Sequence, residues 1–399
     1  MSKYNFDTVI DRTNTNSVKW DFRGQIFGSQ EVLPMWVADM DFPAPPPVVE
    51  AIVQRAQHGI YGYADGNEEY SAATAAWQER RFNWRVAKDW LVYVPGIVPA
   101  LNWIVQTFTD PGESVVIQPP VYFPFFKAIR NNGREVLNNQ LLEINGRYHM
   151  DLPDLEQKLA SGAKMLILCS PHNPVGRVWT KEELHQLGNL CLRYNIMVVS
   201  DEIHSDLVYP EYKHTPFPMA CPELQNSTIV CTAPSKTFNL AGLQISNLII
   251  PNPELRDSLR ATMAKIGISH PNVFGITALQ TAYRYGEDWL EQLLSYLAGN
   301  RDFLIRFVLA NMSEIKVSAP EGTYLVWLDF RNLGLQPNAL REFLLNRAKV
   351  ALNDGYTFGP GGEGFARINI ACPRSTLTEG LTRIAEAIRG INQLNYSKV

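Results

Sequence analysis

A lysine flanked by hydroxyl residues follows an apolar run in this chain. The run covers 227–232 and has the pattern of a buried strand, and the segment after it contains Ser235-Lys236-Thr237. An ammonium group is costly to bury, and burial lowers its pKa, which leaves a free amine able to attack a carbonyl. We therefore interpret Lys236 as a Schiff-base lysine. Taken by itself, such a lysine is more often a surface residue of a strand-to-helix loop.

Other residues would complete a site around this lysine. Asp201 ends an apolar run, where a carboxylate needs a cation, and a protonated pyridine nitrogen would supply one. Asn173 would donate to a phenolate oxygen on the same ring, and Tyr122 would stack on the ring or bond to that oxygen. The turn Gly96-Ile97-Val98 offers backbone N–H groups to a phosphate. Together these residues predict a site for pyridoxal phosphate.

Arg367 lies in an otherwise apolar, strand-like run at 365–371. Its guanidinium needs a partner there, and the planar fork of N–H groups fits the α-carboxylate of an amino acid. A charge-assisted hydrogen bond of this kind contributes about 1.5 to 3 kcal/mol net. The competing interpretation is an ion pair with a carboxylate of the protein itself.

The elements that would position these residues alternate along the chain. Continuous apolar strands separated by helices are typical of an α/β fold, in which helices cover both faces of a parallel sheet. Ligands of such sheets bind beyond the carboxyl ends of the strands. The candidate residues follow such ends, so we expect one pocket to contain them. The predicted strands are 91–94, 114–117, 164–169, 196–200, 227–232 and 248–250.

Helical spacing predicts helices over 48–58, 70–82 and 99–108, and Thr180 with Glu183 predicts a capping box for a helix reaching about 194. The C-terminal part mixes strands at 323–327 and 365–371 with helices, which indicates a small α+β domain. The proline run at 43–47 marks a connector, because proline continues neither a helix nor a central strand. We expect a large domain over 47–285 and a small domain built from 1–46 and 286–399.

Composition excludes several classes of partner and site. The 399 residues include 36 basic and 40 acidic ones, a net charge of −4, with no long run of like charge, so nucleic acids and anionic membranes are poor partners. The chain has no apolar signal-peptide core and no run of about 18 apolar residues, so we expect a cytoplasmic protein. The five cysteines have no CxxC spacing, and the histidines form no HExxH pattern. Buried reduced thiols and no metal site are expected.

Four motifs resemble those of the fold type I pyridoxal-phosphate enzymes: Ser-Pro-His-Asn-Pro-Val-Gly-Arg-Val-Trp at 170–179, Ser-Asp-Glu-Ile-His-Ser-Asp at 200–206, Ser-Lys-Thr-Phe-Asn at 235–239 and Ala-Arg-Ile-Asn-Ile-Ala-Cys-Pro-Arg at 366–374. Asp-Glu-Ile-His followed by Ser-Lys-Thr-Phe-Asn is most similar to the MalY/PatB group of carbon–sulfur lyases, which includes cystalysin. Asp-Met-Asp-Phe at 39–42 and Gly62-Tyr63 match that group too. The resemblance spans nearly the whole chain. It implies a large domain with a mostly parallel seven-stranded sheet covered by helices, plus a small α+β domain.

Carried over residue by residue, the resemblance implies a role for each candidate. Lys236 would hold the cofactor, Asp201 would meet its pyridine nitrogen, Arg367 would bind the substrate carboxylate, and Tyr63 would reach the cofactor phosphate of the other subunit of an obligate homodimer. Lys236, Tyr122 and Asp201 are the expected catalytic residues, and Arg367, Asp39 and Tyr63 the expected substrate-binding residues. The expected cofactor-binding residues are Lys236, Gly96, Ile97, Val98, Tyr122, Asn173, Asp201, His204, Thr232, Ser235 and Tyr63.

The implied reaction is β-elimination of a sulfur amino acid, L-cystathionine or L-cysteine, to thiol or sulfide, pyruvate and ammonia. Two positions depart from the common aminotransferase pattern: Gln244 stands where a phosphate-binding arginine is frequent, and Ala233 where a serine is. The missing arginine favours the lyase group. The alternatives are an aminotransferase of the same fold and a lyase with an added regulatory, protein-binding role.

Overall fold

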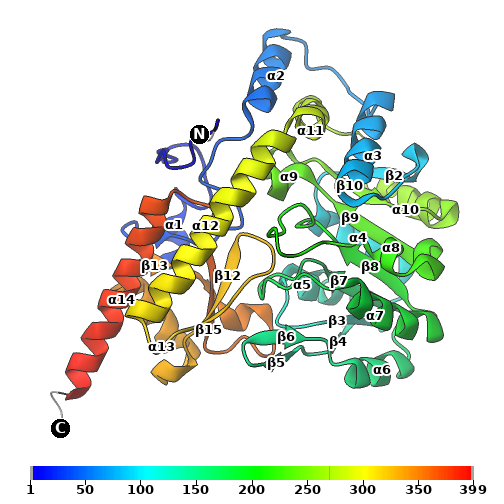
Figure 1. Ribbon diagram of the computed structural model, residues 1–399. Coiled ribbons are helices and arrows are strands. Elements are labelled where there is room, and N and C mark those ends of the chain that lie inside the picture. Colours follow the sequence, from blue (N-terminus) through cyan, green and yellow to red (C-terminus); the bar gives the residue numbers. More distant parts are fainter. Residues whose placement is uncertain (1–2, 269, 397–399) are drawn as a thin grey trace.

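The computed structural model describes residues 3–268 and 270–396 (Figure 1). Its centre is a seven-stranded sheet in which β10 alone runs antiparallel to its neighbours, so the expected α/β fold with a mostly parallel seven-stranded sheet is confirmed. In spatial order the strands are β2 (Leu91–Val94), β10 (Ser246–Ile249), β9 (Thr228–Thr232), β8 (Met197–Asp201), β7 (Met165–Cys169), β3 (Ser114–Ile117) and β4 (Glu135–Asn138).

Helices cover both faces of this sheet because successive apolar side chains along each strand point to opposite sides. One face packs on α4 (Ile97–Phe108), α5 (Pro124–Arg130) and α10 (Pro253–Lys265) through Val115, Ile117, Ile167 and Val199. The other face packs on α6 (Leu152–Ala160), α7 (Lys181–Arg193) and α8 (Phe217–Ala220) through Val116, Leu166, Leu168 and Val198. The expected capping box at the start of α7 is confirmed: Thr180 accepts from the Glu183 N–H, and the Glu183 side chain accepts from Thr180.

A second, four-stranded antiparallel sheet follows later in the chain, in the order β11 (Lys316–Ser318), β12 (Leu325–Asp329), β15 (Phe365–Asn369) and β14 (Asn353–Asp354). Two long helices, α12 (Glu287–Asn311) and α14 (Arg374–Tyr396), run beside each other, and α12 packs against β11 of this sheet (Figure 1). The segment 337–347 holds α13 (Pro337–Glu342) and a π-helical turn, Phe343–Arg347. The domain boundaries at 46/47 and 285/286 stay a prediction.

The N-terminal segment lies along this second sheet. In it, β1 (Leu33–Pro34) pairs with β13 (Val350–Ala351), and Asn369 on β15 donates to the carbonyls of Val37 and Asp39, both at 2.6 Å. Residues that follow β9 of the large sheet also bind this segment: Lys236 donates to the carbonyl of Ala38, and Asn239 donates to the carbonyls of Met40 and Phe42. The remaining elements are α1 (Arg23–Phe27), α2 (Pro46–Gln57), α3 (Glu68–Phe82), α9 (Pro234–Thr237), α11 (Val273–Tyr285) and the hairpin of β5 (Leu142–Ile144) and β6 (Arg147–His149).

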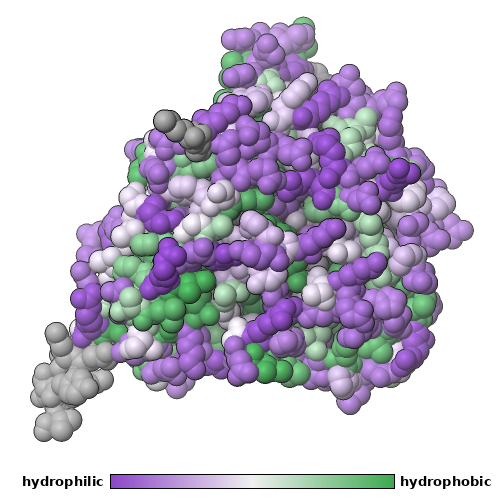
Figure 2. Space-filling model, viewed as in Figure 1, coloured by the Kyte–Doolittle hydropathy of each residue, from purple (hydrophilic) through white to green (hydrophobic). Residues whose placement is uncertain are grey.

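The face of the molecule in Figure 2 is mainly hydrophilic, with smaller hydrophobic areas between polar ones. Among the helices that the structure describes, none is both long enough and apolar enough to cross a membrane. All five cysteines are buried and free.

Candidate active site

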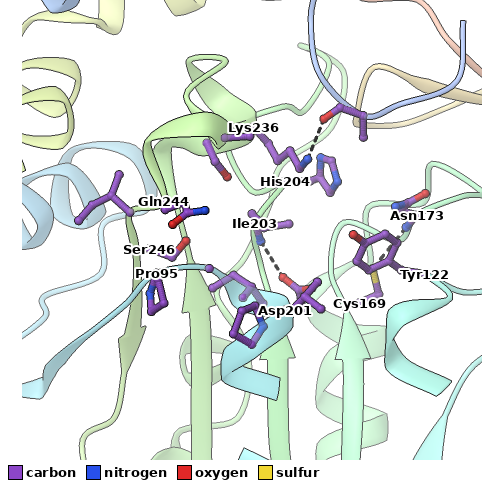
Figure 3. Close-up of a pocket in the computed structure, with 18 residues that line it drawn as sticks. Pro95, Tyr122, Cys169, Asn173, Asp201, Ile203, His204, Lys236, Gln244 and Ser246 are labelled. Carbon is purple, nitrogen blue, oxygen red and sulfur yellow. Dashed lines mark hydrogen bonds between the residues drawn. The ribbon is translucent and has the colours of Figure 1, made fainter. Parts of the chain in front are cut away.

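The carboxyl ends of the large sheet open onto a cavity of about 220 Å³ (Figure 3). Gly96 follows β2, Tyr122 follows β3, Asn173 follows β7, Asp201 ends β8, and Lys236 lies on α9 just after β9; all five line the cavity. The structure therefore brings these predicted residues together, as the geometry of parallel strands requires. Ile97, Val98, His204 and Ser235 line it as well.

Lys236 extends across the cavity from the short helix α9 (Figure 3). Its Nζ donates to the carbonyl oxygen of Ala38 at 2.7 Å, and no carboxylate of the described chain forms an ion pair with it. Burial lowers the pKa of Lys236 to about 8, a shift that Arg367 reinforces and that the carboxylates of Asp39 and Asp201 oppose. A large share of the amine is thus unprotonated near pH 8, which is the form that reacts with a carbonyl carbon.

Asp201 lies at the floor of the cavity, below Ile203 in Figure 3. One carboxylate oxygen accepts from the backbone N–H of Ile203 at 3.2 Å, and no cation of the described chain pairs with the carboxylate. Burial raises the pKa of Asp201 to about 7. A cation beside it would favour the ionised form and lower that pKa, so the site is suited to a protonated ring nitrogen.

Tyr122 and Asn173 lie together on one side of the cavity, near Cys169 (Figure 3). Burial raises the pKa of Tyr122 to about 12, so its hydroxyl is a neutral donor. The side-chain oxygen of Asn173 accepts from Arg367 Nη1 at 2.8 Å, which fixes the amide so that its nitrogen is the group left to donate to a ligand. His204 is held neutral, because burial and then Lys236 and Arg367 push its pKa well below the usual value, and its Nδ1 has no hydrogen-bond partner among the described residues.

The opposite side of the cavity is suited to an anion. Helix α4 begins there after Gly96, without a side-chain cap, so the first N–H groups of the helix are free to bind a phosphate. Ser235, Gln244 and Ser246 line the same cavity, whereas Thr232 does not, although its hydroxyl is buried without a hydrogen-bond partner in the described chain. Ser235 and Ser246 are therefore the hydroxyls best placed to replace the absent arginine. Thr232 as a cofactor contact stays a prediction.

Arg367 projects from the middle of β15 and is almost fully buried. Its Nη1 donates to Asn173, its Nη2 donates to the Asn353 side chain at 2.6 Å and to the carbonyl of Trp36 at 3.2 Å, and its Nε has no partner in the described chain. Burial lowers its pKa to about 10. No described carboxylate pairs with it, so the ion pair within the protein, weighed as the alternative, is absent there. An uncompensated buried cation of this kind is suited to bind a carboxylate from a ligand.

Asp39 forms an ion pair with Arg12 within the N-terminal segment. Both of its carboxylate oxygens accept from Arg12, at 2.7 and 3.2 Å, and Lys19 approaches it to 3.7 Å. It does not line the cavity, but its charge favours the protonated form of Lys236. The neighbouring Asp41 is buried against Lys19 and Arg12. The predicted contact of Asp39 with substrate stays a prediction.

Tyr63 is fully exposed and does not line this cavity. It lies in a surface groove that shares Pro95 and Gln244 with the cavity. Sequence reasoning missed several lining residues: Ala38, Cys169, Ile203 and Ser246. Ala38 contributes a backbone carbonyl and Ile203 an apolar side chain, so neither has a residue type that signals chemistry. Ser246 is the first residue of β10, but the predicted strand begins only at 248, so the prediction does not include this hydroxyl.

The comparisons with known proteins agree with this geometry. Residues 31–384 match the family model described as aminotransferase class I and II. The chain belongs to this family. It is 44% identical over 385 residues to the cystathionine beta-lyase PatB of Bacillus subtilis (strain 168), which is covered in full by 96% of this chain. Protein MalY of Escherichia coli (strain K12) is 37% identical, with 97% of this chain and all of that protein covered.

Among solved structures, cystalysin from Treponema denticola, which contains a pyridoxal 5'-phosphate cofactor, superposes with a TM-score of 0.94 at 39% identity over 97% of this chain and 99% of that one. The resemblance to the MalY/PatB group is thereby confirmed. The cavity of this family member also fits pyridoxal phosphate on its own geometry. It combines a lysine of lowered pKa, a buried carboxylate without a cation and free helix N–H groups, which match the aldehyde, the ring nitrogen and the phosphate.

Proposed function

We propose that this protein is a pyridoxal-phosphate-dependent carbon–sulfur lyase that eliminates the thiol from the β-carbon of a sulfur amino acid, L-cystathionine or L-cysteine. The observation that carries the proposal is that Lys236 and Asp201 line one buried cavity. Arg367, which pairs with no described carboxylate, does not line the cavity itself but donates to Asn173, which does. The names of the relatives, a cystathionine beta-lyase and cystalysin, support this reaction. The pyridoxal-phosphate enzyme expected from the sequence is confirmed by the family and by these relatives.

Each part of the cofactor has a residue to hold it. Lys236 would bind the aldehyde carbon, Asp201 the ring nitrogen and Asn173 the ring oxygen, while Tyr122 would cover the ring and the start of α4 would bind the phosphate. When bound, pyridoxal phosphate supplies a ring that accepts the electrons left behind when a proton departs from the substrate α-carbon. A carboxylate at Asp201 keeps that ring protonated and so keeps it able to accept them.

The protein's own residues then bind the substrate and move protons. Arg367 binds the α-carboxylate and fixes the Cα–H bond relative to Lys236. Lys236 accepts the α-proton at Nζ, and the thiolate leaves the β-carbon with the electrons of the carbon–sulfur bond. A proton returned to the thiolate and one water complete the balance: L-cystathionine and water give homocysteine, pyruvate and ammonia. The same lysine serves each proton transfer, because the transfers come in sequence.

Product analysis tests which bond is broken. L-Cystathionine has two carbon–sulfur bonds, and the purified protein loaded with pyridoxal phosphate is expected to release homocysteine and pyruvate. Cysteine and 2-oxobutyrate in their place would show cleavage on the other side of the sulfur and would contradict β-elimination. Thiols and keto acids are both separable by chromatography, so one reaction mixture gives the answer.

Replacing Arg367 with lysine is expected to raise KM for L-cystathionine about 10-fold or more, with a smaller change in kcat. A point charge replaces a planar fork, and the loss of a charge-assisted hydrogen bond of about 1.5 to 3 kcal/mol corresponds to a factor of about 10 to 150. Steady-state kinetics measure it. Arg193→Lys, at an exposed position, is the control and should leave KM unchanged. A KM for Arg367→Lys equal to that of the unmodified enzyme would rule out the carboxylate role.

We also propose that the enzyme is a homodimer in which Tyr63 reaches the cofactor phosphate of the other subunit. Tyr63 is fully exposed, and its groove adjoins the active-site cavity through Pro95 and Gln244. Ile60 and Tyr61 beside it are exposed as well. Exposed apolar side chains of this kind are typical of a surface that a partner covers.

The free, buried cysteines support a reducing compartment, and we place the enzyme in the cytoplasm.

Mixed dimers test the role of Tyr63. Tyr63→Ala is expected to weaken cofactor binding, and Lys236→Ala to be inactive. If Tyr63 serves the other subunit, a dimer of one Tyr63→Ala chain and one Lys236→Ala chain keeps one intact site. At a cofactor concentration that leaves Tyr63→Ala alone inactive, an equal mixture that exchanges subunits should regain about a quarter of the unmodified activity. No gain over the separate variants would mean that Tyr63 serves its own subunit or neither.

A further inference from the structure

A second cleft, here called the distal cleft, lies beside the carboxylate-binding end of the active site. It has a volume of about 320 Å³, and its lining includes Phe27, Trp36, Phe123, Lys127, Asn353 and Asp354. Four parts of the chain meet there: the N-terminal segment, the loop and helix after β3, helix α13 through Arg341, and the segment 352–357 around β14. The catalytic residues assigned above do not line it.

The distal cleft adjoins Arg367. The carbonyl of Trp36 and the side-chain oxygen of Asn353 both accept from Arg367 Nη2, at 3.2 and 2.6 Å, and both residues line the cleft. Phe123 packs against Tyr122, with ring centroids 5.4 Å apart. Arg367 and Tyr122 thus each contact a residue that lines the distal cleft, so a ligand held between them lies next to this cleft.

The charges in the distal cleft fit a zwitterion. The Nζ of Lys127 lies 5.4 Å from the centre of the Phe123 ring, and no described carboxylate pairs with it. Asp354 forms an ion pair with Arg341 through Oδ2, and no described residue donates to its Oδ1. The cleft thus offers an unpaired ammonium and an open carboxylate oxygen. The aromatic rings of Phe27, Trp36 and Phe123 offer apolar surface between them.

We propose that the distal cleft binds the leaving half of L-cystathionine, so that Lys127 pairs with its distal carboxylate and Asp354 Oδ1 accepts from its distal ammonium. The aromatic rings cover the methylene groups and the sulfur between the two ends. This inference rests on the proposed β-elimination and specifies its substrate: an amino acid whose leaving thiol itself carries an amino-acid group. L-Cysteine and S-methyl-L-cysteine end before the cleft and gain nothing from it.

Two substrates compared in one variant test the inference. In Lys127→Met, KM for L-cystathionine should rise about fivefold, the size expected for a partly exposed ion pair, while kcat/KM for S-methyl-L-cysteine stays within about twofold. Lys127→Glu should raise KM for L-cystathionine further, because a like charge then faces the distal carboxylate. Arg130→Met is the matched control: Arg130 lies on the same helix but packs over Phe126 outside the cleft, so neither substrate should respond.

The outcomes separate this inference from the proposed function. If Lys127→Met changes the kinetic constants of both substrates in parallel, or of neither, the distal cleft does not bind the leaving group. The lyase assignment would still stand. If the unmodified enzyme cleaves S-methyl-L-cysteine but not L-cystathionine, the inference is again overturned and the lyase assignment stands. If the unmodified enzyme yields pyruvate from neither substrate, both fail. Thermal unfolding of each variant verifies that the fold is kept.

Discussion

The Lys236→Ala variant should form pyruvate more than about 1,000-fold more slowly than the unmodified enzyme while it keeps its fold. The loss combines the covalent attachment of the cofactor with general acid–base catalysis, which alone contributes about 100- to 10,000-fold. Lys236 Nζ makes one hydrogen bond, to the carbonyl of Ala38, so truncation removes little that stabilises the fold. Pyruvate formation and circular dichroism measure the two halves of the prediction.

Lys213→Ala is the control for this experiment, because Lys213 is exposed and lies outside the cavity. It should keep full activity. Reduction of the unmodified holoenzyme with borohydride, followed by peptide mass spectrometry, adds a readout independent of turnover. The cofactor mass should appear on the peptide containing Lys236. A mass on another lysine, or near-normal turnover in Lys236→Ala, would remove Lys236 from the centre of the mechanism.

Asp201→Asn should lower kcat by about 100-fold or more and also weaken cofactor binding. Removing one partner of a buried ion pair costs about 3 to 5 kcal/mol, and a neutral amide no longer keeps the ring nitrogen protonated. The asparagine has nearly the same shape, so the cavity is kept. Steady-state kinetics and titration of the apoprotein with pyridoxal phosphate measure these two losses.

In the apoprotein, by contrast, Asp201→Asn should not lower the unfolding temperature. Burial raises the pKa of Asp201 to about 7, above its value of about 4 in an unfolded chain. The folded apoprotein therefore loses stability through this group as pH rises from about 4 to 7, and the loss is complete above pH 7. At pH 8 the variant should therefore unfold at the same or a higher temperature than the unmodified apoprotein. A stable but inactive variant supports the pairing with the cofactor. Full activity in Asp201→Asn would contradict it.

The large sheet and the core of the site could be predicted because local pattern specifies them. The strands 91–94 and 114–117 have the predicted bounds, since each is a short apolar run. Once the strands are parallel, their carboxyl ends meet at one edge, and this places Asn173, Asp201 and Lys236 in one cavity without any further information.

The parts that could not be predicted depend on contacts between distant segments. The carbonyl that holds Lys236 belongs to Ala38, nearly 200 positions earlier, and a backbone oxygen leaves no trace in residue type. Asp39 carries a functional residue type, but its oxygens are taken by Arg12. The reversed direction of β10, between β2 and β9, is likewise a tertiary result, because its apolar run is compatible with either direction.

Turnover without a keto acid tests the central claim most directly, because it separates elimination from amino-group transfer at the same cavity. The purified holoenzyme is given excess L-cystathionine, and pyruvate, free thiol and the state of the cofactor are followed in one reaction. We expect pyruvate and thiol to appear in equal amounts over many turnovers per subunit, with the cofactor unchanged at the end. At most one turnover per subunit, with the cofactor converted to its amine form and restored only by an added keto acid, would show that the protein is an aminotransferase instead.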